Sequence, residues 1–129
     1  MKAGDSQFFN KKGIQKDLTL ELSEGENLLE SIREGMIQNK INKAVLKAIQ
    51  GKINNCCVNF MLGSRFKSKE ILLANVLNAS GQYELKGKNN ELFGNMHLVF
   101  QNEKNTMTFV KGTAAEGLKI VLSFVHVPE

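Results

Sequence analysis

Residues 18–39 read LTLELSEGENLLESIREGMIQN, and this stretch decides the fold class. In residues 18–22 leucine alternates with polar residues, which indicates a half-buried strand. Ser23 stands three residues before Glu26, which is the spacing of a capping box at the start of a helix. Apolar residues then recur at helical spacing. We therefore expect one amphipathic helix over about Gly25–Asn39, with its apolar face packed on a sheet.

The rest of the chain is dominated by expected strands, which are segments of alternating or continuous apolar residues separated by turn residues. These segments are Ile53–Leu62, Glu70–Leu77, Gln82–Leu85 after a bend or bulge at Asn78–Gly81, Met96–Phe100 and Leu118–His126. The segment Lys43–Ile49 fits either a helix or a short strand. One helix among six or seven strands predicts an α+β fold with a mainly antiparallel sheet.

Length and composition fit one globular domain. The chain has 129 residues, of which 42% are hydrophobic and 23% charged, and no apolar run is long enough to cross a membrane. We expect a flexible N-terminal arm over residues 1–13 and a single domain over residues 14–129. The first ten residues lack the apolar core of a signal peptide, and the two cysteines, Cys56 and Cys57, form no disulfide framework. These features favour the cytoplasm and no membrane partner.

Motifs of catalysis and cofactor binding are missing from the sequence. It has no phosphate-binding loop, no dinucleotide fingerprint and no nucleophile elbow. The two histidines are His97, within an expected strand, and His126, near the chain end, and both are more typical of packing residues than of ligands. A zinc site needs at least three protein ligands, and the histidines and cysteines lack that spacing. We expect neither an enzyme nor a cofactor.

The chain is mildly basic, which permits an anionic partner without requiring one. Its net charge is +4, and fifteen lysines outnumber two arginines. The lysines are dispersed, and a lysine is a point charge that is poorly suited to reading a base edge. Lys40, Lys43, Lys47 and Lys52 follow the expected helix and could form a basic edge, but a solvated face explains them equally well.

Five short segments carry a further signal through their order and spacing. They are LELSEGENL at residues 20–28, AIQGKINN at 48–55, KEIL at 69–72 followed by Gly81, GNMHL at 94–98 and VKGTAAEGL at 110–118. Together they resemble the plants and prokaryotes conserved (PPC) domain, which stands alone in bacteria and archaea and is also carried by plant AT-hook proteins. The resemblance covers roughly Leu18–Val127, which is nearly the whole chain.

The resemblance implies an α+β fold assembled as a homotrimer, and it makes Lys43–Gln50 a strand. Many prokaryotic members hold a metal with three histidines, two in a His-x-His strand and one after a Gly-Gly pair. Here His97 matches the first position, while Val99 and Thr113 stand at the other two. Valine cannot bind a metal, so the resemblance implies no metal site in this chain. The AT-hook that supplies DNA contact in plant members is absent from the sequence.

Three functions are compatible with these observations. The first is a stand-alone homotrimer that binds DNA or assists a DNA-binding partner, with non-specific phosphate contacts from Lys40, Lys43, Lys47 and Lys52. The alternative is a small-molecule-binding protein or enzyme with a pocket at the trimer interface. That pocket would be lined by His97, Glu70, Asn95, Gly112 and Thr113. A third reading is a scaffold that presents surfaces to other proteins.

Overall fold

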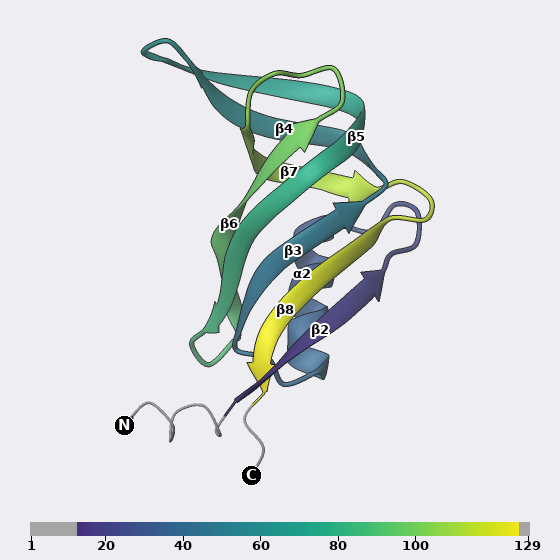
Figure 1. The fold of residues 1–129 in the computed structure, drawn as a ribbon, viewed down its shortest axis with the longest axis vertical. Coiled ribbons are helices and arrows are strands. Elements are labelled where there is room, and N and C mark those ends of the chain that lie inside the picture. Colours follow the sequence, from purple (N-terminus) through teal and green to yellow (C-terminus); the bar gives the residue numbers. More distant parts are fainter. Residues whose placement is uncertain (1–12, 127–129) are drawn as a thin grey trace, which may run out of the picture.

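The computed structural model describes residues 13–126, which form one helix and seven strands (Figure 1). The elements in chain order are β2 (Ile14–Glu21), α2 (Leu28–Gln38), β3 (Lys43–Gln50), β4 (Lys52–Leu62), β5 (Arg65–Lys86), β6 (Glu91–Phe100), β7 (Met107–Ala114) and β8 (Lys119–His126). All strand pairs are antiparallel, so the predicted α+β fold with a mainly antiparallel sheet is confirmed. The expected N-terminal arm lies outside the described residues, apart from Gly13. Within residues 13–126 no helix is long and apolar enough to span a membrane.

The long strand β5 connects two parts of the sheet. Its first half, Arg65–Asn75, pairs with β4, and its second half, Val76–Lys86, pairs with β6. The segment Gly81–Glu84 also pairs with β3. The strand order is therefore β2-β8-β3-β5-β4-β7-β6, with β5 and β6 paired in addition. In Figure 1, β2, β8, β3 and the second half of β5 form one layer with α2 behind it, while β4 and β7 cross above this layer.

The hydrophobic core is one cluster enclosed by α2, the inner face of this layer and the strands β4, β6 and β7. Leu28, Ile32 and Met36 of the helix are fully buried, as the helical spacing predicts. The buried strand residues include Leu46 and Ile49 of β3, Met96, Leu98 and Phe100 of β6, and Ile120 and Leu122 of β8. Successive residues of a strand point to opposite faces, so the residues between these buried positions form an open outer face. The open face is where ligands and partners have access.

The helix begins later than the sequence pattern predicts. Its N-cap is Asn27, whose Oδ1 accepts a hydrogen bond from the backbone N–H of Glu30 at 2.9 Å. The predicted start at Gly25 is wrong, because Gly25 has a φ of +90°, outside the helical region. Ser23 and Glu26 instead form a turn before the helix, in which the backbone N–H of Ser23 donates to Oε1 of Glu26 at 2.6 Å.

The helix ends at Gln38 with Asn39 as its C-cap, and the next residue, Lys40, has a left-handed backbone with a φ of +57°. The backbone N–H of Ile41 donates to the carbonyl of Met36 at 2.9 Å, and the N–H of Lys40 donates to the carbonyl of Ile37 at 3.2 Å. This is the Schellman arrangement, in which glycine usually takes the left-handed position. The chain then enters β3, so Lys43–Gln50 is a strand, as the resemblance implied.

Strand β5 continues through Asn78–Gly81, where a bend or bulge was expected. A β-bulge is present, and it lies between Val76 and Asn78, at the start of that segment. Further along, Gly81 and Gly94 of the paired strands β5 and β6 have φ values of +149° and +142°. A β-carbon on Gly94 would overlap the carbonyl oxygen of Gln82. The glycines therefore permit a close approach of β6 to β5 that a side chain would prevent.

Candidate functional site

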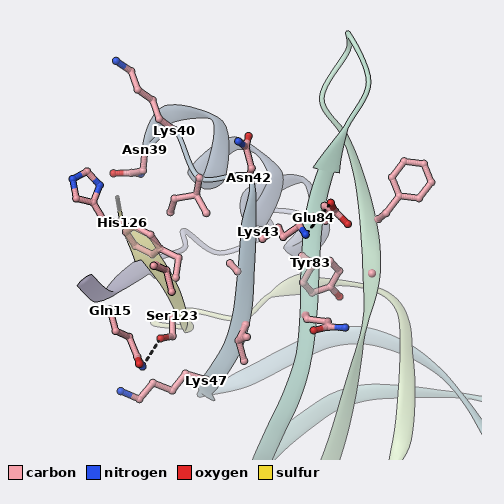
Figure 2. A pocket seen from close by; sticks show the side chains of 18 residues that line it. Gln15, Asn39, Lys40, Asn42, Lys43, Lys47, Tyr83, Glu84, Ser123 and His126 are labelled. Carbon is pink, nitrogen blue, oxygen red and sulfur yellow. Dashed lines mark hydrogen bonds and ion pairs between the residues drawn. The ribbon is translucent and has the colours of Figure 1, made fainter. Parts of the chain in front are cut away.

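A groove of about 1440 Å³ lies on the open face of the main layer (Figure 2). Strand residues whose sequence neighbours point into the core, such as Val45 and Gln82, contribute to its surface. The loop after α2 borders it with Asn39, Lys40 and Asn42. The lining residues are Gln15 of β2, 39–42 after the helix, 43–45 and 47 of β3, 82–84 of β5, Phe93 and Gly94 of β6, and 123–126 of β8.

Three of the four predicted phosphate-binding lysines line this groove, namely Lys40, Lys43 and Lys47. Nζ of Lys43 lies 3.8 Å from Oε2 of Glu84, and Nζ of Lys47 lies 2.7 Å from Oδ2 of Asp17. Lys40 has no ion-pair partner within the part of the chain that the structure describes. The groove thus carries one cation without a counter-charge and two that are held by exposed acidic partners.

The fourth predicted lysine, Lys52, lies apart from the other three. It starts β4 and borders a second, smaller hollow of about 350 Å³. The loop after β6 lines the same hollow with Gln101, Asn102 and Glu103. The predicted set of four lysines therefore divides into a group of three and a separate residue.

The ion pair between Asp17 and Lys47 shapes the electrostatics at one side of the groove. The hydrogen bond from Lys47 holds the pKa of the Asp17 carboxyl below its usual value of 3.8, and the charge of Lys47 and a hydrogen bond from Ser123 add to this effect. Asp17 therefore remains ionised across the neutral range and accompanies Lys47 as a fixed counter-charge.

Two buried side chains with weakly acidic groups are held in their neutral forms. Burial raises the pKa of the Tyr83 phenol, which lines the groove and is only 5% exposed. Burial also raises the pKa of the Cys56 thiol to about 12, with a further contribution from the adjacent Cys57. A nucleophilic cysteine needs a thiolate, so Cys56 is not suited to covalent catalysis.

His97 stands in a row of paired polar residues that crosses several strands. It pairs with Ser80 of β5 and with Thr108 of β7; Thr108 also pairs with Asn59 of β4, which pairs with Ser68 of β5. Nδ1 of His97 lies 3.3 Å from Oγ1 of Thr108, and Oγ of Ser68 donates to Oδ1 of Asn59 at 2.8 Å. Directly paired residues of antiparallel strands share a face, so these five side chains form one polar row, called the His97 row below.

Of the residues predicted to line a pocket with His97, Asn95 lies close to it and Glu70 does not. Asn95 lies two residues before His97 on β6 and therefore shares its face, as does Val99 two residues after it. Glu70 lies on the first half of β5, two residues from Ser68 at the far end of the His97 row. That end is three strands from His97, or about 14 Å at the usual strand spacing.

The other two predicted companions, Gly112 and Thr113, belong to a different part of β7. Thr113 pairs with Asn54 and forms an isolated bridge with Asn27. It stands five residues beyond Thr108, the partner of His97, which is roughly 16 Å along an extended strand. The structure therefore brings Asn95 to the face of His97 but leaves Gly112 and Thr113 at a distance.

The same geometry bears on the metal site of related proteins. Within residues 13–126 no three histidine, cysteine, aspartate or glutamate side chains come together. Val99, beside His97 on β6, has no donor atom, and Thr113 is remote from His97. The residues present do not fit a three-ligand metal site at this position.

A sequence model of the Plants and Prokaryotes Conserved (PCC) domain matches residues 9–127. The chain belongs to this family. The resemblance seen in the five short segments is confirmed, and the PCC match covers both layers of the sheet and the helix. No curated protein matches the chain.

Solved structures share the PCC fold at low sequence identity. A PPC protein from Pyrococcus horikoshii is similar with a TM-score of 0.67 and 20% identity, covering 100% of this chain and 87% of its own. A metal-containing protein from Archaeoglobus fulgidus has a TM-score of 0.65 and 17% identity, with coverages of 87% and 81%. A Ralstonia eutropha protein described as a "putative DNA-binding protein" has a TM-score of 0.62 and 15% identity, with coverages of 93% and 86%. At these identities the likeness establishes the fold alone.

Sequence reasoning about this PCC domain missed both the groove and the His97 row. The groove gathers residues from five strands and one loop, and the alignment of those strands depends on the bulges in β3 and β5. The signal that could have found Phe93 and Val45 is their position on the face opposite the buried residues of their strands. The His97 row exists because β4 and β7 pair with register shifts between them. Local sequence patterns do not reveal such shifts between distant strands.

Proposed function

We propose that this PCC-domain protein is a cytoplasmic homotrimer that associates with DNA through non-specific phosphate contacts. The observation that carries the proposal is the gathering of Lys40, Lys43 and Lys47 on one groove of the open sheet face. A lysine ammonium is a suitable partner for a phosphate oxygen and a poor reader of base edges. The expected binding is therefore weak, insensitive to sequence and strongly dependent on salt.

Assembly would strengthen such contacts. One chain has a net charge of +4, and three chains would sum their charges and present three grooves. Residues 13–126 also expose eleven large hydrophobic side chains, and contiguous exposed apolar surface is typical of contacts between protein chains. These features support an oligomer, and the PCC family supports a trimer in particular.

Two structural neighbours provide separate support for a DNA partner. The proteins from Ralstonia eutropha and Bacteroides thetaiotaomicron are both described as DNA-binding, in each case as a suggestion. Both share the fold of this chain at TM-scores of 0.62. The groove lysines give this chain a concrete surface on which the same activity can be tested.

The test is the binding of a fluorescent DNA duplex, measured by anisotropy at low salt. The first variant carries Lys40→Gln, Lys43→Gln and Lys47→Gln. A matched control carries Lys52→Gln, Lys88→Gln and Lys104→Gln, which removes the same charge from residues that do not line the groove. The proposal expects the groove variant to lose at least tenfold in affinity while the control stays within a few-fold of the unmodified protein. Equal losses in both variants, or no binding by the unmodified protein, would overturn it.

A small-molecule or catalytic site around His97 is the alternative. The His97 row favours it, because a half-buried imidazole next to a hydroxyl can donate or accept a proton. It has less support, since Glu70, Gly112 and Thr113 lie away from His97 and the metal ligands of the family are incomplete. His97→Ala tests this alternative: a ligand that raises the melting temperature of the unmodified protein should fail to do so in the variant. Equal stabilisation of both proteins would exclude His97 from the site.

A further inference from the structure

The hairpin between β4 and β5 extends beyond the rest of the sheet. Asn59 is the last residue of β4 that pairs with β7, through Thr108. Beyond it, residues 60–62 pair only with residues 65–67 of β5. Residues 60–67, called the tip below, project from the body of the molecule in Figure 1. A hairpin of two strands is marginally stable by itself, so the tip needs a surface to pack against.

The tip and the adjoining strand carry large apolar side chains that face water. Met61 and Phe66 are cross-strand partners in the tip, and they are 56% and 66% exposed. Leu62 is next to them, and Leu72, Leu73 and Leu77 follow along β5. All six are more than half exposed. Successive residues of a strand point to opposite faces, so Leu62 and Leu73 lie on the other face from Phe66 and Leu72, and the exposed side chains flank the hairpin on both faces. At roughly 150–200 Å² for each side chain, the six together expose on the order of 600 Å² of apolar surface.

The same segment also has an unpaired backbone edge. β3 pairs with β5 only from Gly81 onward, and β6 pairs with it only from Val76 onward. Within the described part of the chain, residues 65–74 of β5 therefore have β4 on one side and no strand on the other. Such an edge presents free N–H and C=O groups and is a template for pairing with another chain.

We propose that the tip and the free edge of β5 form the surface through which one copy of this chain binds the next. One partner of a standard interface buries about 800 Å², of which somewhat more than half is apolar, and a partner that straddles the edge and contacts both faces would find that amount of apolar surface. This inference names the contact surface of the homotrimer and so rests on the assembly proposed above.

The charges of the edge favour a second copy joined head to tail. Arg65, Lys67 and Lys69 alternate along the edge strand, and Lys69 is paired with Glu103. Arg65 and Lys67 have no ion-pair partner within residues 13–126, so two such edges paired with each other would bring like charges together. The outer edge of β2, at the opposite border of the sheet, is free of strand partners within residues 13–126 and carries Asp17, already paired with Lys47, and Glu21, with Lys16 as its one basic residue. Contact between two different surfaces closes into a ring when the rotation allows it, and a trimer is such a ring.

Light scattering coupled to size-exclusion chromatography tests this surface. The variant Met61→Ser with Phe66→Ser removes the two paired apolar side chains of the tip. The control Val45→Ser with Val125→Ser removes two exposed apolar side chains from the groove face. All four positions are exposed, so the fold should survive, and circular dichroism checks that it does. We expect the unmodified protein and the control at three times the 14.4 kDa chain mass and the tip variant at that mass itself.

The possible results distinguish a wrong contact surface from a wrong oligomeric state. A tip variant that stays trimeric would overturn the assigned surface and leave the trimer intact. An unmodified protein that runs as a monomer would overturn the trimer. Hydrogen exchange of the backbone amides of residues 65–74 in the unmodified protein provides a second measurement. We expect these amides to be protected in the trimer and to exchange at least tenfold faster in the tip variant; unprotected amides in a trimer would also overturn the assigned surface.

Discussion

Lys47 of β3 and Asp17 of β2 form an ion pair of 2.7 Å that reaches across strand β8 on the open face of the sheet. The pair holds a groove lysine in place and lowers its effective charge toward a ligand. A DNA phosphate that binds Lys47 has to compete with the Asp17 carboxylate. This competition is one reason to expect weak binding to DNA.

The first prediction concerns the pH dependence of stability. The pKa of Asp17 is lower in the folded protein than its usual value of 3.8. The ionised carboxylate therefore stabilises the fold above about pH 4, and this stabilisation is lost as the pH falls through the lowered pKa. Asp17→Asn should reduce the melting temperature slightly at pH 7, and the difference should vanish at strongly acidic pH. Asp17 is exposed, so high salt should also shrink the difference. A difference that stays constant from pH 7 to pH 2 would contradict the pairing.

The second prediction concerns the left-handed lysine at the end of α2. A left-handed backbone costs a non-glycine residue about 1–2 kcal/mol, and glycine avoids that cost. Lys40→Gly should therefore raise the free energy of unfolding by about 1 kcal/mol, measured by urea denaturation. Lys43→Gly, in the regular strand β3, should lower it instead. A destabilised Lys40→Gly protein would show that the lysine side chain stabilises the fold more than its backbone strain costs.

The third prediction separates the expected helix start from the observed one. The side chain of Asn27 caps the helix, whereas Ser23 contributes its backbone N–H to the turn before it. Asn27→Ala should cost about 1 kcal/mol of unfolding free energy. Ser23→Ala keeps the backbone N–H and should change stability by less than about 0.5 kcal/mol. The reverse order of the two effects in chemical denaturation would place the cap at Ser23.

The fourth prediction tests the close approach of β5 and β6. A methyl group at Gly94 would overlap the carbonyl oxygen of Gln82, and the backbone of β5 cannot move without disturbing its pairing with β3. Gly94→Ala should cost about 3 kcal/mol or more. Gly87 also has a positive φ, of +80°, but has open space around it, so Gly87→Ala should cost only about 1 kcal/mol. Thermal melts of the two variants compare these costs directly, and equal melting temperatures would contradict the crowding at Gly94.

The helix and most strands were predictable because their signals are local. Leu28, Ile32 and Met36 repeat at helical spacing, and all three are fully buried in the fold. The start of the helix was misplaced because Ser23 and Glu26 match the local pattern of a cap, although Gly25 between them leaves the helical conformation. The identity of Lys43–Gln50 as a strand came from the family resemblance, since its own residues suit a helix equally well.

The candidate sites were harder to predict because they depend on strand register. Lys40, Lys43 and Lys47 share one groove because a tight helix end leads directly into β3. Thr113 and His97 are separated because β7 pairs Thr108, and not Thr113, with His97. The sequence contains all these residues, but their distances follow from bulges and shifts that involve partners far along the chain.

The salt dependence of DNA binding tests the central claim most directly. The slope of log affinity against log salt falls by about 0.9 for each phosphate contact that is lost. We predict that the unmodified protein binds duplex DNA with a steep slope. In the variant with Lys40, Lys43 and Lys47 replaced by glutamine, the magnitude of the slope should be smaller by roughly 3 for each groove that contacts the DNA, because three phosphate contacts are lost there. The Lys52, Lys88 and Lys104 variant should keep the full slope. Equal slopes for all three proteins would contradict binding through the groove.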